Sequence, residues 1–128
     1  MSMPASDLDT VTLYHPVGPQ ELALLKASGM RRWPPRLPEQ SIFYPVTNAA
    51  YATEIARDWN VPASGSGFVT QFQVRADFMR QYPVQQVGAG HHTEWWVPAE
   101  DLESLNDHIV GTIAVIHEFH QLGEHHDH

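Results

Sequence analysis

The chain has no cysteine among its 128 residues, and it has little positive charge. The absence of cysteine excludes disulfide bonds, zinc sites built on thiolates and cysteine nucleophiles. Lysine and arginine together number 7 against 15 aspartates and glutamates, so the formal net charge is -8. This balance disfavours nonspecific attraction to a nucleic-acid backbone, although it leaves nucleic acid open as a substrate.

Long hydrophobic runs are also missing. No apolar run approaches the roughly 18 residues that predict a membrane-spanning helix. Residues 1–10 are polar and acidic, and they lack the apolar core of a secretion signal. We therefore expect a cytoplasmic protein with no membrane partner. Residues 1–10 and the His- and acid-rich residues 121–128 are expected to be tails around a single domain at residues 11–120.

The remaining pattern predicts an α+β domain of short elements rather than a doubly wound parallel sheet. Six strands are expected, at residues 11–17, 41–46, 68–74, 83–87, 93–97 and 111–117, the first of them broken by Pro16. Helices are expected at residues 20–28, from a cap at residue 47 or 48 to about residue 59, at residues 76–82 and from residue 98 onward. Three prolines make residues 30–40 a stiff loop.

The four tryptophans divide into two groups by their surroundings. Tyr51, Ile55 and Trp59 recur every four residues, which predicts a buried helical stripe that includes Trp59. Trp33 in the proline-rich loop, and one of Trp95 and Trp96, are better candidates for the wall of a ligand site.

Three residues could carry chemistry: His15, Tyr44 and Glu94. Glu94 lies in an expected strand between a histidine pair and a tryptophan pair. A carboxylate buried there without a partner would cost several kcal/mol. It is therefore either paired or functional. Each of the three residues alone is more often structural, so their order along the chain and their surroundings carry the argument.

In that order, the chain resembles small bacterial ADP-ribosyltransferase-like domains of the His-Tyr-Glu type. The resemblance lies in three motifs: Leu-Tyr-His-Pro-Val-Gly at 13–18 before a helix, Ile-Phe-Tyr-Pro-Val-Thr-Asn at 42–48, and Thr-Glu-Trp-Trp-Val-Pro-Ala-Glu-Asp-Leu at 93–102 with Ile-Val-Gly-x-Ile-x-Val at 109–115. It extends over roughly residues 12–116. The chain is also similar to short proteins labelled "ADP-ribosylation/crystallin J1", a label that properly belongs to a larger, helical, magnesium-dependent hydrolase.

The resemblance implies a fold of two small packed β-sheets, a split sheet core, with NAD bound as substrate in a cleft between them. It implies that His15 hydrogen-bonds a ribose hydroxyl, that Tyr44 flanks the nicotinamide and that Glu94 is the catalytic carboxylate. Tyr14 and Trp33 are further candidates for cofactor binding, and no metal is expected. The acceptor of ADP-ribose stays unknown, and His92, two residues before Glu94, argues against arginine, because members that modify arginine have Glu or Gln there.

Cleavage of NAD requires the same kinds of side chain, whatever the family. Cleavage of the nicotinamide–ribose bond builds positive charge on the sugar, as in glycoside hydrolysis. A fixed carboxylate stabilises that charge, an aromatic face stacks on the leaving ring, and an imidazole can bond a ribose hydroxyl.

Two alternatives remain open. The first is a cupin-like metal site in which His91 or His92 joins Glu94 and one of His108, His117 and His120. If His91 and His92 lie in a strand, they point to opposite faces, and at most one of them could share an ion with Glu94. The second is a non-catalytic binding or immunity-type protein whose negative surface docks a basic partner.

Overall fold

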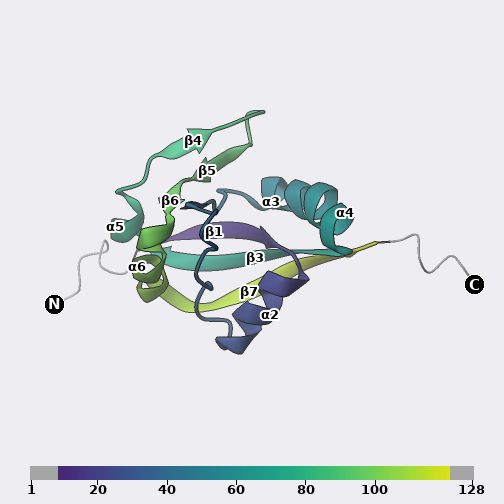
Figure 1. Ribbon diagram of the computed structural model, residues 1–128. Coiled ribbons are helices and arrows are strands. Elements are labelled where there is room, and N and C mark those ends of the chain that lie inside the picture. Colours follow the sequence, from purple (N-terminus) through teal and green to yellow (C-terminus); the bar gives the residue numbers. More distant parts are fainter. Residues whose placement is uncertain (1–8, 122–128) are drawn as a thin grey trace, which may run out of the picture.

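A computed structural model describes residues 9–121 and shows an α+β domain built on a small antiparallel sheet (Figure 1). The strands are β1 (Thr10–Val17), β2 (Ile42–Phe43), β3 (Ser66–Arg75), β4 (Val84–Gln86), β5 (Thr93–Trp95), β6 (Val97–Pro98) and β7 (Ile109–His120). The helices are α2 (Pro19–Ala27), α3 (Ala49–Ile55), the π-helical η1 (Ala56–Asn60), α4 (Val61–Ser64), α5 (Ala76–Met79), the 3-10 turn η2 (Ala99–Asp101) and α6 (Leu102–Asp107). Within residues 9–121, each helix is too short or too polar to cross a membrane.

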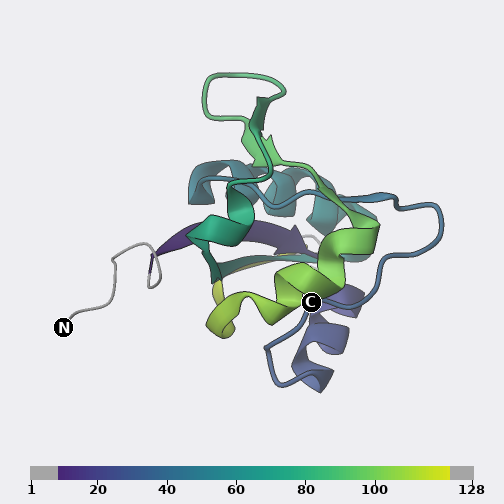
Figure 2. The ribbon, with the colours of Figure 1, turned by 90° about the vertical axis from the view of Figure 1, so that its left-hand side faces the viewer.

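The main sheet has the strand order β1-β3-β7, with every pairing antiparallel. Helix α2 lies on one side of this sheet, and α3 with α4 lies on the other (Figure 1). Two smaller pairs, β2 with β6 and β4 with β5, complete the strands. Val46 links these parts, because it bridges Tyr14 of β1 on one side and Glu94 of β5 on the other. The β4–β5 hairpin projects away from the rest of the domain (Figure 2).

The two faces of the sheet have separate cores, which we call the α2 face and the α3 face. The core of the α2 face is the larger, and Leu13, Phe72 and Leu25 are buried in it. The core of the α3 face is a small cluster of buried Val46, Ala52, Ala56 and Val69. Successive side chains of a strand alternate between faces, so neighbouring residues of β1 belong to different cores.

Strand β1 runs through Pro16, where the sequence predicted a break. Tyr14 exchanges both backbone hydrogen bonds with Val46 (3.0 and 2.7 Å), so its N–H points away from β3. The nitrogen of Pro16, two residues on, points the same way. Its missing N–H therefore removes no bond of the β1–β3 ladder, which explains why the strand tolerates it.

The prediction that Trp59 is buried is wrong, since its side chain is 73% exposed. The helix that Asn48 caps is α-helical only to Ile55 and then continues as the π-helical η1. A π-helical turn holds more residues than an α-helical turn, which shifts the following side chains around the axis. The stripe therefore ends at Ile55, and Trp59 turns toward solvent.

Glycine 67 lets the same segment approach the sheet. A Cβ at this position would lie 2.3 Å from the carbonyl oxygen of Ala56, a contact that no side chain tolerates.

Residue 10, expected in a tail, instead begins β1, and residue 120 ends β7. Residues 1–8 and 122–128 of the expected tails lie outside the described residues.

Candidate functional site

The three segments that the sequence singled out lie side by side. Val46 lies between Tyr14 of β1 and Glu94 of β5 and forms an antiparallel bridge with each of them. The Trp95 amide also donates to the Pro45 carbonyl at 2.9 Å. Directly opposed residues of antiparallel strands share a face, so the side chains of Tyr14, Val46 and Glu94 all lie on the α3 face.

His15 lies on the α2 face, one residue along β1 from Tyr14. The residue is 8% exposed, and its ring packs against the rings of Trp33 and Phe43, at centroid distances of 5.0 and 4.6 Å. Its Nδ1 lies 3.3 Å from the backbone carbonyl oxygen of Tyr44, which ties β1 to the segment after β2. His15 is thus enclosed among aromatic side chains in the core.

The second nitrogen of His15 faces a carboxylate. Nε2 lies 3.6 Å from Oε2 of Glu21 on α2, and the Arg36 guanidinium lies 3.7 Å from the same oxygen. Burial by itself would raise the pKa of Glu21, but the hydrogen bond and charge of His15, and then the charge of Arg36, outweigh it and lower the pKa. This network joins β1, α2 and the proline-rich loop beneath the sheet.

Glu94 is buried on the α3 face, with 8% of the residue exposed, and both of its oxygens are hydrogen-bonded. The Tyr51 hydroxyl of α3 donates to Oε1 at 3.1 Å, and the indole Nε1 of Trp96 donates to Oε2 at 2.7 Å. Burial and then the charge and hydrogen bond of Glu94, with a further contribution from Glu54, raise the pKa of Tyr51 to about 12. Tyr51 therefore remains a donor at neutral pH.

Two half-exposed aromatic rings lie beside this carboxylate. Tyr44 is 43% exposed and Trp96 is 41% exposed, and their rings meet edge to face with centroids 6.3 Å apart. We call Glu94, Tyr51, Trp96 and Tyr44 the Glu94 site. It combines a fixed carboxylate with an aromatic surface that a ligand can reach.

The expected convergence of His15, Tyr44 and Glu94 on one crevice does not occur. The strands meet as expected, but alternation along β1 puts the His15 ring on the α2 face and Glu94 on the α3 face. Tyr44 is shared between them, since its carbonyl contacts His15 and its ring contacts Trp96. A one-residue difference in strand parity is enough to separate side chains whose backbones are neighbours.

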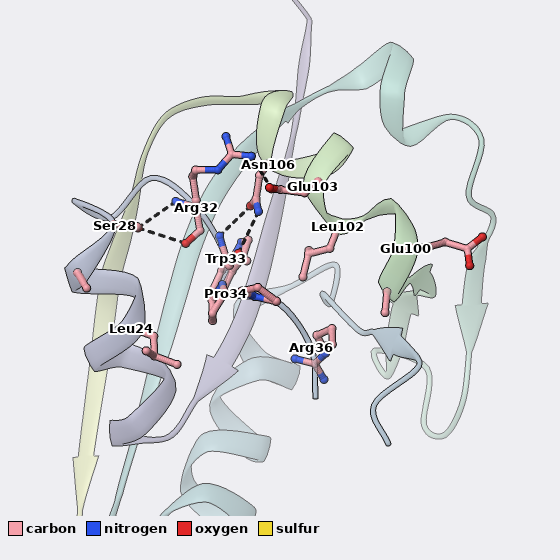
Figure 3. Close-up of a pocket in the computed structure, with 13 residues that line it drawn as sticks. Leu24, Ser28, Arg32, Trp33, Pro34, Arg36, Glu100, Leu102, Glu103 and Asn106 are labelled. Carbon is pink, nitrogen blue, oxygen red and sulfur yellow. Dashed lines mark hydrogen bonds and ion pairs between the residues drawn. The ribbon is translucent and has the colours of Figure 1, made fainter. Parts of the chain in front are cut away.

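The two further candidates for cofactor binding are also separated. The hydroxyl of Tyr14 accepts a hydrogen bond from Gln71 Nε2 at 3.2 Å on the α3 face. Trp33 is buried on the other face and contributes to a cavity of about 700 Å³ between α2, the proline-rich loop and α6 (Figure 3). The side-chain amide of Asn106 on α6 makes two hydrogen bonds with the backbone of Trp33. Its Oδ1 accepts from the Trp33 amide at 2.8 Å, and its Nδ2 donates to the Trp33 carbonyl at 3.0 Å.

This cavity is mostly apolar, with charged groups at its edge. Leu24, Pro34 and Leu102 contribute apolar walls. Arg32 at the edge is bonded to Glu103 at 2.6 Å (Figure 3) and lies 3.1 Å from Asp107. Neither Glu94 nor Tyr44 lines the cavity, so a ligand held there would not touch the Glu94 site.

A third group of polar residues lies where the β4–β5 hairpin meets α3. His91 and His92 both direct Nε2 at the carboxylate of Glu54, with the His92 nitrogen 2.8 Å from Oε1 and the His91 nitrogen in contact with Oε2. Both histidines precede β5 in a turn, so the alternation that separates adjacent side chains of a strand does not apply to them. We call Glu54, His91 and His92 the hairpin triad.

Comparison with models of known families, with curated proteins and with solved structures gives no match for this chain. The geometry of the chain's own residues therefore carries the functional interpretation.

Sequence reasoning singled out the histidine pair but joined it to the wrong carboxylate. Glu94 bonds Tyr51 and Trp96, whereas Glu54 is the partner of the histidines. The other histidines considered as ligands lie elsewhere: His108 stacks on Phe78, His117 lies beside Phe119, and His120 contacts Ser66. The sequence carried no local signal for Glu54, because only the tertiary structure shows which segment packs against its helix.

Proposed function

We propose that this protein is an ADP-ribosyltransferase-like domain that binds NAD and cleaves its nicotinamide–ribose bond at the Glu94 site. The observation that carries the proposal is a buried carboxylate, held by two neutral donors, beside two half-exposed aromatic rings. The order of the three neighbouring segments, β1, Val46 and β5, supports the resemblance to that family, which implies the fold.

The reaction needs charge stabilisation more than proton transfer. As the bond between the ribose C1′ and the nicotinamide nitrogen breaks, the nicotinamide leaves with the bonding electron pair and the sugar becomes an oxocarbenium-like cation. Glu94 would stabilise that cation, because its carboxylate is fixed by Tyr51 and Trp96. An acceptor then bonds to C1′ and loses its proton to solvent. Tyr44 and Trp96 offer the departing ring a stacking surface.

His15 acts in this proposal as a positioning residue. Its ring is enclosed on the α2 face, and its contact with the Tyr44 carbonyl holds the backbone on which the Tyr44 ring sits. A direct contact of His15 with ribose, as the family resemblance implies, would need the proline-rich loop to move away. Trp33 and Arg36 of that loop cover His15 and its partner Glu21.

The acceptor is left open by the chemistry of the site. His92 occupies the position that is acidic or amide in members that modify arginine, and its Nε2 is bonded to Glu54. We therefore propose an acceptor other than arginine. A cytoplasmic location also belongs to this proposal.

The test is release of nicotinamide from NAD, followed by chromatography, together with NAD-dependent thermal stabilisation. We expect Glu94→Gln to keep the fold and lower turnover about a hundredfold or more, as when one electrostatic contact to a transition state is removed. The matched control is Glu39→Gln, an exposed carboxylate in the proline-rich loop, which should leave turnover unchanged. Normal turnover by Glu94→Gln, or no effect of NAD on the unaltered protein, would overturn the proposal.

A second candidate function is binding without catalysis, and the cavity on the α2 face favours it. Its size suits a small organic molecule, and Trp33 gives it an aromatic wall. Ala27→Trp, at the cavity edge on α2, should then abolish ligand binding, whereas Ala23→Trp on an exposed part of the same helix should not. If Ala27→Trp leaves NAD turnover intact, the cavity is separate from the reaction.

A further inference from the structure

Two imidazoles and one carboxylate meet at the hairpin triad. One ligand atom from each residue, a ring nitrogen of His91, a ring nitrogen of His92 and a carboxylate oxygen of Glu54, lies within 4.8 Å of the other two. Among residues 9–121, this is the one such group of histidine and acidic side chains. All three side chains are exposed or half-buried, so an ion from solvent can reach them.

The surrounding residues hold this group in place. Asn48 Nδ2 donates to the His91 carbonyl at 2.7 Å, while Asn48 Oδ1 caps α3 by accepting from the Tyr51 amide at 2.8 Å. The Tyr51 ring stacks on His92 with centroids 4.5 Å apart and an angle of 22° between the planes. One asparagine thus anchors the histidine turn to the helix that carries Glu54.

Glycine 88 provides the space for one ligand ring. A Cβ at this position would lie 2.5 Å from Nδ1 of His92, so any other residue here would force the imidazole to shift. The hairpin turn is therefore shaped around the imidazole.

The donor set matches a known class of metal site. Two imidazole nitrogens and one carboxylate form the three-ligand set of catalytic zinc and of non-haem iron sites, with further positions left open. We propose that the hairpin triad binds a divalent transition-metal ion of the Zn²⁺ type through His91 Nε2, His92 Nε2 and Glu54. Zinc takes such nitrogens and oxygens at about 2.0–2.2 Å, so small rotations of these three side chains admit it.

Metal binding requires a defined rearrangement of protons. Nδ1 of His92 now accepts a hydrogen bond from the Ala89 amide at 3.2 Å, which leaves the proton of a neutral ring on Nε2. A histidine that binds metal through Nε2 carries its proton on Nδ1. The proton moves between the ring nitrogens with no net release, and water replaces His92 at the exposed Ala89 amide.

The inference does not rest on the proposed reaction with NAD. The two sites are nevertheless in contact through Tyr51, which stacks on His92 and donates a hydrogen bond to Glu94. Zinc binding without NAD turnover would leave the inference standing and the proposed function refuted, and the reverse result would do the opposite.

The test is calorimetric titration of the full chain with Zn²⁺, in a background that removes a competing chelator. The last residues include His125, His126 and His128, so all three are replaced by glutamine. In this background we expect one zinc ion per chain. His91→Gln, His92→Gln and Glu54→Gln should each weaken binding at least tenfold, because each removes one of three ligands.

The matched control is His117→Gln, an exposed histidine of β7 outside the triad, which should bind zinc as the background does. Co²⁺ provides a second readout, since its visible absorption reports imidazole coordination and should disappear in the triad variants. Circular dichroism checks that each variant is folded. No zinc binding in the background, or binding that survives His91→Gln and Glu54→Gln, would overturn the inference.

Discussion

The two faces of the sheet use their polar side chains in opposite ways. On the α2 face, His15 is enclosed by Trp33 and Phe43, and both of its nitrogens face groups of the protein itself. On the α3 face, Glu94 accepts hydrogen bonds from Tyr51 and Trp96. The rings of Trp96 and the neighbouring Tyr44 remain half exposed. The α2 face therefore buries His15 within packed side chains, whereas the α3 face leaves aromatic rings beside Glu94 open to solvent.

The largest expected difference between the faces is in stability. Phe72 of β3 is 1% exposed and packs against Trp33 on the α2 face. Phe72→Ala should lower the free energy of unfolding by about 3–5 kcal/mol, the usual cost of removing a buried phenyl ring. Tyr44→Ala, at a half-exposed ring on the other face, should cost much less. Urea denaturation measures both, and equal losses would contradict the contrast between the faces.

A smaller effect is expected where the hairpin is tied to α3. Asn48→Ala removes the helix cap and the bond to the His91 carbonyl, and should cost about 1 kcal/mol of unfolding free energy. Asn48→Asp keeps the capping oxygen but loses the donor to His91. It should therefore be more stable than Asn48→Ala. Both variants should bind zinc more weakly than the unaltered chain, because both lose the bond to the His91 carbonyl. If Asn48→Asp binds zinc like the unaltered chain, the tether to His91 has no role in the triad.

The third prediction concerns acid stability on the α2 face. The pKa of Glu21 lies below its ordinary value of 4.5, because His15 and Arg36 outweigh the effect of burial. A carboxyl with a lowered pKa in the fold stabilises the protein above the ordinary pKa, and this contribution is lost as the pH falls from about 4.5 through the lowered value. Glu21→Gln should therefore flatten the fall in stability in this acidic range.

The measurement is a series of urea denaturations between neutral pH and pH values below 4.5. Glu39→Gln, at an exposed carboxyl of the same charge, is the control. An unchanged pH profile for Glu21→Gln would mean that the ion pairs with His15 and Arg36 contribute nothing measurable.

The smallest effect is expected at Trp59. Its side chain is largely exposed, and tryptophan and serine have similar helix propensities. Trp59→Ser should change the free energy of unfolding by no more than about 0.5 kcal/mol. A loss of several kcal/mol would instead support the buried stripe that the sequence predicts.

Much of the element order could be predicted from local patterns. Asn48 caps α3 as expected, α2 lies within one residue of its predicted bounds, and the alternating residues 68–74 lie within β3. These features depend on residues close in sequence. The π-helical turn at residues 56–60 breaks the four-residue spacing of Tyr51, Ile55 and Trp59, and no local pattern in the sequence predicted this turn.

The sequence by itself determined the α+β class, the helix caps and the short list of polar residues, because propensity and periodicity act over a few neighbouring residues. Only the tertiary structure decided which of these residues share a surface. The pairing of Tyr14, Val46 and Glu94 sets the face of every side chain on these strands, and it places His15 away from Glu94. The packing of the hairpin turn on α3 gives the histidine pair Glu54 as its partner, since contacts between distant segments depend on register and packing rather than on local sequence.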